Sequence, residues 1–383
     1  MNFEESAEHQ DLRRAVAKLC ERFGDEYFRD VLARDAKTDE LWSALGEHGF
    51  LGVNLPEEYG GGGAGIAELA IVVEETAAAG SPLLLLLVSA AISGEVLKDF
   101  GTAEQQQRWL PAMADGSDKM VFAITEPNAG SNSHQISTTA TRDGDGWLLR
   151  GTKYYISGVD EASHLLVVAR TGTTDSGRGT MTLFVVDTDA PGLQRNMIPV
   201  EVRAPEKQFT LSFDDVRVGD DRRVGEVDAG MEIVFRGLNP ERITGAAIEN
   251  GIARYALAKA ARYASEREVW GVPIGSHQGV AHPMAAAAIE LEASRLMMAK
   301  AAWCHDNRKP AGEVSNMAKY LAAESALHSI DTAIQTHGGN GLATEYGLAH
   351  LWGMARLLKI APVSREMILN YVSGHSLGLP RSY

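Results

Sequence analysis

The stretch MVFAITEPNAGSNSHQ, Met120 to Gln135, marks the point at which the character of the chain changes. An apolar run, Met120 to Ile124, breaks at Thr125-Glu126-Pro127 into a loop of small residues that ends near Ser133. A short apolar run that ends in a proline-containing turn is typical of a buried strand followed by a loop. Helical periodicity precedes this stretch and alternating patterns follow it, so it divides the chain.

The residues before this stretch predict an N-terminal α-helical domain over residues 1–118. Leu12, Val16 and Leu19 recur every three to four positions, as on the buried face of a helix. Thr102 with Gln105 three residues later is typical of a helix start. The predicted helices are Ala7–Phe23, Asp39–His48, Ala67–Ala79, Leu83–Phe100 and Thr102–Ala114.

After Asp118 the pattern alternates, which predicts a central β domain over residues 119–227. Asp143-Gly144-Asp145-Gly146 is a hairpin signal between the first two strands. Short strands at this spacing favour a small antiparallel barrel or sandwich. The predicted strands are Ser137–Thr141, Gly146–Arg150, Lys153–Ile156, Leu165–Ala169, Thr180–Asp187 and Phe209–Val216.

Helical periodicity returns near Met231 and predicts a C-terminal four-helix bundle over residues 228–383. Within the first segment, Pro240 suits the first turn of a new helix, so we expect an interruption at Asn239-Pro240. The predicted segments are Glu232–Glu268, His282–Asn307, Ser315–His337 and Leu348–Tyr371. The expected fold is therefore an α+β multidomain protein with the order helices, β unit, helices.

Composition excludes several classes of protein. The formal net charge of -15 over 383 residues argues against a nucleic-acid partner. The two cysteines lie far apart, which disfavours a disulfide framework and predicts a reducing, cytoplasmic location. The acidic start lacks the order of a signal peptide, and the apolar run Pro82–Ile92 is too short to cross a bilayer. His277, His282 and His305 lack ligand spacing, so we expect no metal site.

Several motifs together resemble the acyl-CoA dehydrogenases. Ala123-Ile124-Thr125-Glu126-Pro127-x-Ala129-Gly130-Ser131 resembles the first signature of that family, and Gln335-x-x-Gly338-Gly339-x-Gly341 resembles the second. Trp147 to Ser157 and Arg267-x-x-Trp270-Gly271 also match. The resemblance covers essentially the whole chain. It implies an FAD enzyme that oxidises the α,β bond of an acyl-CoA thioester, passes electrons to an electron-transfer flavoprotein and assembles as a homotetramer, a dimer of dimers.

The resemblance also implies which residues contact FAD. Phe122 to Thr125 would supply contacts to the polar edge of the flavin, and Tyr155 to Ser157 an aromatic wall and a hydroxyl group. From composition alone a strand and turn of the core is the better explanation of both stretches, and only the joint spacing of the motifs reverses that preference. The implied FAD residues of one subunit are Phe122, Ile124, Thr125, Ser131, Tyr155 and Ser157, and Gln278, Ser364 and Glu366 are implied as further FAD contacts. Those implied for the neighbouring subunit are Arg267, Trp270, Gln335, Gly338 and Gly339.

The catalytic base is where the chain departs from most relatives. The reaction needs a carboxylate that removes the α proton, and many members place a Glu where this chain has Pro362. A minority, including the isovaleryl and long-chain branches, place it at the position of Glu241. We therefore predict Glu241 as the base, with Arg242 and Asn239 as substrate contacts. The alternative is that Glu241 follows Pro240 only because acidic residues favour the first turn of a helix.

Pro362 leaves the activity open in other ways. Proline has no N–H, whereas relatives use the backbone N–H at this position to hold the thioester oxygen. A flavin oxidase or monooxygenase on the same fold and a non-catalytic subunit of a heteromer are therefore alternatives. Ser131 is predicted to approach the thioester or the pantetheine. Leu83 to Leu87 suggests an apolar acyl group, although packing alone explains these leucines, and the carrier is either CoA or a carrier protein.

Overall fold

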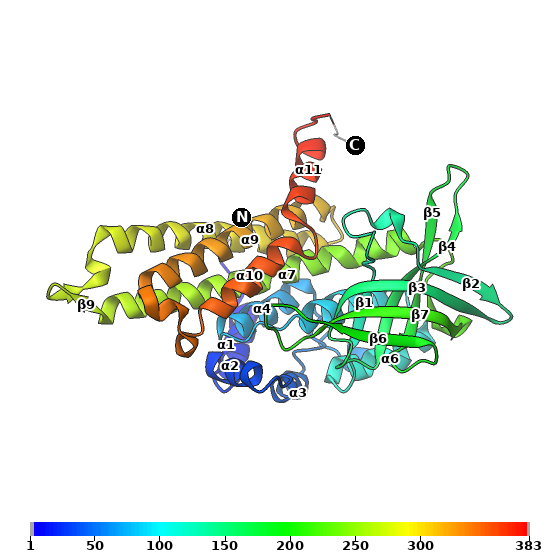
Figure 1. Ribbon diagram of the computed structural model, residues 1–383, viewed down its shortest axis with the longest axis horizontal. Coiled ribbons are helices and arrows are strands. Elements are labelled where there is room, and N and C mark those ends of the chain that lie inside the picture. The colour runs from blue at the N-terminus through cyan, green and yellow to red at the C-terminus, as the bar shows by residue number, and fades with distance from the viewer. Residues whose placement is uncertain (1–3, 381–383) are drawn as a thin grey trace.

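Helices occupy both ends of the chain, and one sheet lies between them in sequence (Figure 1). A computed structural model describes residues 4–380; the outermost residues of the first and last predicted domains, 1–3 and 381–383, lie outside the described residues. This order confirms the predicted α+β class. The N-terminal helices are α1 (Ala7–Cys20), α2 (Asp25–Ala33), α3 (Asp39–Glu47), α4 (Ile66–Ala78), the π-helix η2 (Leu86–Gly94), α5 (Glu95–Phe100) and α6 (Ala103–Asp115).

The helix starts follow the local signals of the sequence. The Thr102 hydroxyl accepts from the Gln105 N–H at 3.3 Å, and the Gln105 side-chain oxygen accepts from the Thr102 N–H at 3.0 Å, which confirms the predicted cap of α6. Two N-terminal predictions are wrong. The first helix ends at Cys20 rather than Phe23, and α2 follows it. The segment Leu83–Phe100 begins as the wider π-helix η2 and becomes α-helical only at Glu95.

The central sheet has the order β6-β7-β3-β2-β4-β5-β8, with β1 paired to β4. It is a mixed sheet rather than the predicted antiparallel one, because β1 and β2 both run parallel to β4. The strand order runs from β6 at one edge of the sheet to β8 at the other. The strands are β1 (Met120–Ala123), β2 (Thr139–Asp143), β3 (Gly146–Ser157), β4 (His164–Thr173), β5 (Gly179–Asp187), β6 (Leu193–Ile198), β7 (Gln208–Gly219) and β8 (Arg223–Val224).

The β2–β3 hairpin confirms the turn signal, since Asp143 pairs with Gly146 across it. However, the two strands predicted over residues 146–156 are one strand, β3. Its pairing with β7 shifts register twice, between Leu149 and Gly151 and between Lys153 and Ile156. The break in alternation that the sequence shows is thus a pair of bulges rather than a strand end.

The C-terminal helices are α7 (Gly230–Glu266), α8 (Gln278–Asp306), α9 (Gly312–His337), α10 (Ala349–Ile360) and α11 (Arg365–His375). The predicted interruption at Pro240 is wrong, because α7 continues through it. Close packing supports the helix there: a Cβ on Gly237 would lie 2.9 Å from a methyl group of Val96 on α5. The last predicted helix is divided into α10 and α11, since Ala361 is extended before Pro362.

The bundle lies end to end with the sheet along the long axis of the molecule, and the N-terminal helices lie along its flank (Figure 1). Buried Glu74 on α4 joins α1, α7 and α8 through ion pairs with Arg13 (3.0 Å), Arg254 (3.2 Å) and Arg295 (2.8 Å). A helix long and apolar enough to span a membrane is absent from residues 4–380. The same residues contain no cluster of three or more His, Cys, Asp or Glu side chains suited to a metal ion.

Candidate active site

The loop after β1 is held by a buried ion pair. The Lys153 ammonium of β3 lies 2.8 Å from the Glu126 carboxylate and donates to the Ile124 carbonyl at 3.0 Å. The same carboxylate accepts from the Ser137 N–H (2.7 Å) and the Thr138 N–H (3.0 Å). Although burial opposes ionisation, Lys153 and these donors lower the pKa of Glu126 to about 2. Glu126 is therefore ionised at neutral pH, where it anchors the loop and is unsuited to be a base.

The remainder of the loop reaches from the sheet to the bundle. The Thr125 carbonyl accepts from the Tyr154 N–H at 2.8 Å, and Ala129 is buried beneath the turn. Ser131 is exposed in this loop, which leaves its hydroxyl accessible to a ligand. Immediately afterwards the His134 ring lies 6.3 Å, between centroids, from the Phe235 ring of α7. The loop thus bridges β3 and the first turns of α7.

Tyr155 stands out on β3 by its backbone and its exposure. Its φ angle of 55° is rare for a bulky residue, and its side chain remains 52% exposed. It packs against Tyr154, with ring centroids 4.5 Å apart. Ser157, two residues later, donates its hydroxyl hydrogen to the Gln208 side chain at 3.0 Å. An exposed aromatic ring on a strained backbone is more typical of a binding surface than of core packing, which favours the ligand interpretation of this stretch.

Glu241 is buried inside the bundle on α7. Only 9% of the residue is exposed, and its Oε2 has no hydrogen-bond partner. Burial raises its pKa to about 7, while the positive charges of Arg242 and Lys319 act in the opposite direction. Because α7 begins at Gly230, Glu241 lies about three turns into the helix. The helix-dipole explanation of its position is therefore wrong, since that effect is confined to the first turn.

Arg242 and Asn239 lie next to this carboxyl group on α7. The Arg242 guanidinium donates to the Asn239 side-chain oxygen at 3.0 Å, whereas its Nε has no partner. Burial lowers the pKa of Arg242, although the charge of Glu241 opposes this change. A buried guanidinium with an unused donor, beside a carboxyl oxygen with no partner, is a polar pair that is open to a further ligand.

The leucine run lies between β3 and this part of α7. A Cβ on Gly158, directly after β3, would meet the Leu85 side chain at 2.8 Å, and one on Gly245 would meet Leu87 at 3.8 Å. All five residues from Leu83 to Leu87 are buried. The run therefore forms an apolar partition next to both candidate surfaces, and its burial agrees with simple core packing as well.

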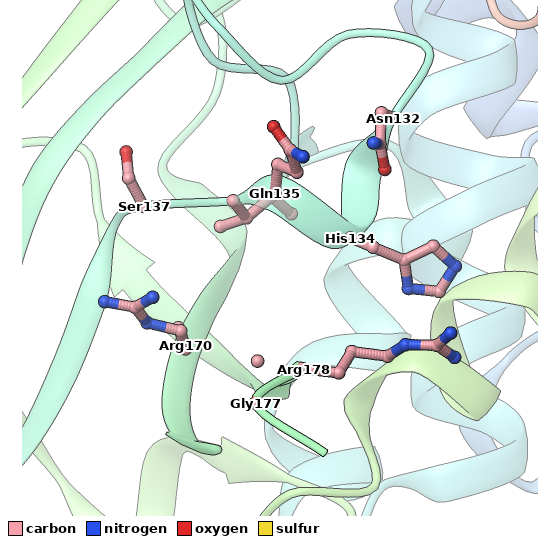
Figure 2. Close-up of a pocket in the computed structure, with 9 residues that line it drawn as sticks. Asn132, His134, Gln135, Ser137, Arg170, Gly177 and Arg178 are labelled. Atoms are coloured by element: carbon pink, nitrogen blue, oxygen red, sulfur yellow. The ribbon is translucent and has the colours of Figure 1, made fainter. Parts of the chain in front are cut away.

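Sequence reasoning missed a basic pocket beside the loop. A cavity of about 520 Å³ is lined by residues of the loop, of β4 and of the β4–β5 hairpin. Figure 2 shows His134 and Arg178 extending to one side of the cavity and Arg170, on β4, extending to the other. The hairpin sequence Gly177-Arg178-Gly179 is a weak indication of an anion site, because glycines beside an arginine allow close approach of an anion.

A second group of predicted residues lies at the opposite end of the molecule. They are all exposed: Arg267, Trp270, Gln278, Gln335, Gly338 and Gly339. Trp270 is 88% exposed with a φ angle of 56°, in the turn between β9 (Glu268–Val269) and β10 (Val272–Pro273). Figure 1 shows β9 at one end of the bundle and β1 and β3 beyond the other end. Glu241 and Arg267 are about 39 Å apart along the helix axis, so one chain does not bring the two groups together.

The remaining predicted residues surround the start of α11. The Ser364 hydroxyl accepts from the Met367 N–H at 3.3 Å and so caps that helix. Glu366 is exposed in its first turn. Pro362 lies in the link between α10 and α11. The cap gives Ser364 a structural role that is independent of any ligand.

Comparison with known proteins agrees with this arrangement. Models of the N-terminal, middle and C-terminal domains of acyl-CoA dehydrogenases match residues 6–117, 121–216 and 228–375. The acyl-CoA dehydrogenase FadE12 of Mycobacterium tuberculosis strain H37Rv is 53% identical, over 100% of this chain and 99% of its own.

Two solved structures extend the comparison to the fold. The glutaryl-CoA complex of a glutaryl-coenzyme A dehydrogenase superposes with a TM-score of 0.94 at 30% identity, covering 100% of this chain and 98% of its own. The FAD complex of PigA superposes with a TM-score of 0.92 at 25% identity, covering 99% and 100%. From the domain matches and the FadE12 identity, the chain belongs to the acyl-CoA dehydrogenase family of oxidoreductases.

Proposed function

We propose that this chain dehydrogenates the α,β bond of an acyl-CoA thioester, with Glu241 as the base that removes the α proton. The observation that carries the proposal is the buried carboxyl group of Glu241, whose Oε2 has no partner and whose pKa is raised to about 7. A base is most effective when its pKa lies near the working pH, because it is then both ionised and able to hold a proton. FAD, when bound, would supply the hydride acceptor for Cβ.

Arg242 would act on the substrate beside the base. Its Nε is a free donor in a buried position, which suits a polar group of the thioester or the pantetheine. Asn239 fixes the guanidinium through the 3.0 Å hydrogen bond. Ser131, exposed at the tip of the loop, would approach the same part of the substrate. The buried leucines Leu83 to Leu87 would exclude water from the acyl group.

We propose that FAD is held between two subunits of a homotetramer. One subunit would contribute Phe122, Ile124, Thr125, Ser131, Tyr155, Ser157, Ser364 and Glu366. The neighbour would contribute Arg267, Trp270, Gln278, Gln335, Gly338 and Gly339. The separation of about 39 Å between Glu241 and Arg267 along α7 supports this division, because it holds the exposed group at the end of the bundle away from the base of the same chain. Tyr155 and Trp270 each combine an exposed ring with a positive φ angle, which suits the two halves of such a site.

The basic pocket supports CoA as the carrier. Arg170 and Arg178 would bind its phosphate groups, with His134 at the edge. On the family resemblance we also propose an electron-transfer flavoprotein as the acceptor, and the domain division 1–118, 119–227 and 228–383. The absence of paired cysteines supports a cytoplasmic location, because Cys20 and Cys304 are both free.

Flavin bleaching by a panel of acyl-CoAs tests the base. Under anaerobic conditions, Glu241→Gln should slow bleaching by about 10²- to 10⁴-fold, the usual contribution of a general base. Glu232→Gln, an exposed residue earlier on α7, is the matched control and should leave bleaching unchanged. Undiminished bleaching by Glu241→Gln would refute the assignment.

The same preparation tests the oxidase alternative, which Pro362 favours because it removes a backbone donor. A dehydrogenase should transfer its electrons to an electron-transfer flavoprotein and consume little oxygen. Rapid oxygen consumption that depends on the substrate would instead identify an oxidase or monooxygenase. A yellow, acyl-CoA-reducible oligomer purified alone would exclude the non-catalytic subunit.

A further inference from the structure

One side of α8 faces away from the rest of the molecule. The helix packs against α4, α7 and α9, and Figure 1 shows it along one edge of the bundle. Three large apolar side chains on its outer side are exposed: Ile289 (72%), Leu296 (46%) and Trp303 (53%). They follow one another at intervals of seven residues, which is two helical turns, so they form one line about 21 Å long. Since Leu291 and Met298 of the same helix are buried, this line is additional to the contacts of α8 with the core.

The residues between these three are small or charged, and they are exposed as well. Ala293 and Ala299 lie three positions before and after Leu296. Glu292 and Lys300 lie four positions before and after it. At 3.6 residues per turn, all four lie within about 60° of Leu296 around the helix. This α8 face consists of Ile289, Glu292, Ala293, Leu296, Ala299, Lys300 and Trp303.

The α8 face matches a reversed copy of itself. In two antiparallel helices related by a two-fold axis at Leu296, each residue before Leu296 lies level with the residue equally far after it in the second copy. Leu296 then lies opposite its own copy, and Ile289 lies level with Trp303. Ala293 lies level with Ala299, and such small side chains let the two helices approach closely. The apolar residues of the two copies therefore meet one another along the whole line.

The charges are complementary in the same register. Glu292 lies level with Lys300 of the second copy, and the two-fold axis repeats this pair. Glu292 is also 3.5 Å from Arg295, but the closer partner of Arg295 is Glu74 at 2.8 Å, which leaves Glu292 available. A parallel pair would instead set each charge against its own copy. Because two chains of net charge -15 repel each other overall, this local match favours an antiparallel second copy.

Polar groups border the α8 face, as they do at the rim of a protein interface. His328 of α9 lies 2.7 Å from Glu290, beside Ile289. At the other end, the Lys309 ammonium lies 5.0 Å from the ring centroid of Trp303. Trp is also among the residue types that dominate the binding energy of protein interfaces.

We propose that the α8 face is a contact between two copies of this chain, in which the two α8 helices pair antiparallel about a two-fold axis at Leu296. A dimer of dimers needs two kinds of two-fold contact, and a shared FAD site would supply only one of them. As a contact within a tetramer the pairing rests on the proposed assembly, whereas the pairing itself also holds in a simple dimer. It requires neither Glu241 as the base nor the residues assigned to FAD.

Leu296→Asp tests the centre of the contact. Because Leu296 lies opposite its own copy, one substitution sets two carboxylates against each other. Light scattering on the FAD-loaded protein should show half the wild-type mass, from tetramer to dimer or from dimer to monomer. Since Leu296 is already 46% exposed, circular dichroism should show an intact fold. Met197→Asp, at an exposed apolar residue of β6, is the matched control and should leave the mass unchanged.

Exchanging the two charges tests the antiparallel register. Glu292→Lys sets like charges level with each other and should raise the dissociation constant of the contact at least about tenfold in sedimentation measurements. Lys300→Glu should do the same. The double variant Glu292→Lys with Lys300→Glu restores opposite charges and should recover the wild-type dissociation constant. In a parallel pair, each single variant would only exchange one like-charged pair for another, and the dissociation constant would not change.

An unchanged mass for Leu296→Asp would overturn the proposal, and a face that binds a different protein would give that result. A monomeric wild type would overturn it too, as would a double variant that associates no more tightly than the single variants. If Leu296→Asp halves the mass while FAD content and bleaching by acyl-CoAs match the wild type, the pairing holds and the FAD site uses a different contact. Failure of the wild type to bleach would count against the proposed function alone, because the mass does not depend on catalysis.

Discussion

Glu126→Gln tests how the loop after β1 is held in place. The substitution keeps the size of the side chain and removes its charge, so the buried ammonium of Lys153 loses its counter-charge. The carboxylate accepts from the Ser137 N–H and the Thr138 N–H through its two oxygens, whereas an amide has only one acceptor oxygen. We expect the folded protein to be destabilised at neutral pH.

The size of the effect follows from the pKa of Glu126, which is lowered from 4.5 to about 2 in the folded protein. Each pH unit corresponds to about 1.4 kcal/mol, so the ionised form contributes about 3 kcal/mol at pH 7. Breaking a buried ion pair by removing one partner costs about 3–5 kcal/mol, which agrees. Because the folded pKa is the lower one, this stability is present above pH 4.5 and is lost as the pH falls toward 2.

Urea unfolding followed by circular dichroism, with FAD in excess in every sample, measures the difference between wild type and variant. The difference should be large at neutral pH and should shrink in acid. Adding Lys153→Met to Glu126→Gln removes the uncompensated charge, and we expect part of the lost stability to return. A loss below about 1 kcal/mol, the scale of one ordinary hydrogen bond, would refute the reasoning. A loss of the same size at neutral and acid pH would also refute it.

Three further predictions concern other buried or basic groups. Burial raises the pKa of Glu206 to about 7, so its contribution to stability falls as the pH rises from 4.5 to about 7; Glu206→Gln should flatten the pH dependence of urea unfolding in that window. Replacing Arg170 and Arg178 together with Gln should weaken CoA binding at least about tenfold in calorimetry and reduce its salt dependence. Burial raises the pKa of the Cys20 thiol to about 11, so a thiol reagent should modify Cys304 first, as peptide mapping would reveal.

Periodicity predicted the type of most elements, because a helix or strand with one buried face leaves a repeating apolar pattern. The errors occurred where packing between distant segments overrides a local rule. Pro240 is a local signal for a helix start, yet α7 passes through it while its neighbours pack against α5. The parallel pairing of β1 with β4 joins residues more than forty positions apart, which a local pattern does not encode.

The candidate functional residues were predictable only where they belong to a recognisable sequence motif. The resemblance named Glu241, and the structure adds the burial that raises its pKa. Arg170 and Arg178 belong to no such motif and line the same cavity only because β4 and β5 form a hairpin. The buried ion pair of Lys319 on α9 and Glu249 on α7 is equally hidden, since a lysine and a glutamate on two long helices predict surface residues until the helices are packed.

Helix α7 connects the separate parts of the proposed chemistry. It carries Glu241 near the sheet and a second buried carboxyl group, that of Glu249, two turns further on. Arg267 follows its last turn at the opposite end of the bundle. A straight helix keeps these groups at fixed separations, so the end that would complete a cofactor site is held far from the base of the same chain. A second copy in the reverse direction would bring one chain's Trp270 end to the other's loop. The length of α7 thus supports the proposed sharing of a cofactor site between subunits, because one chain holds its two groups of candidate residues apart.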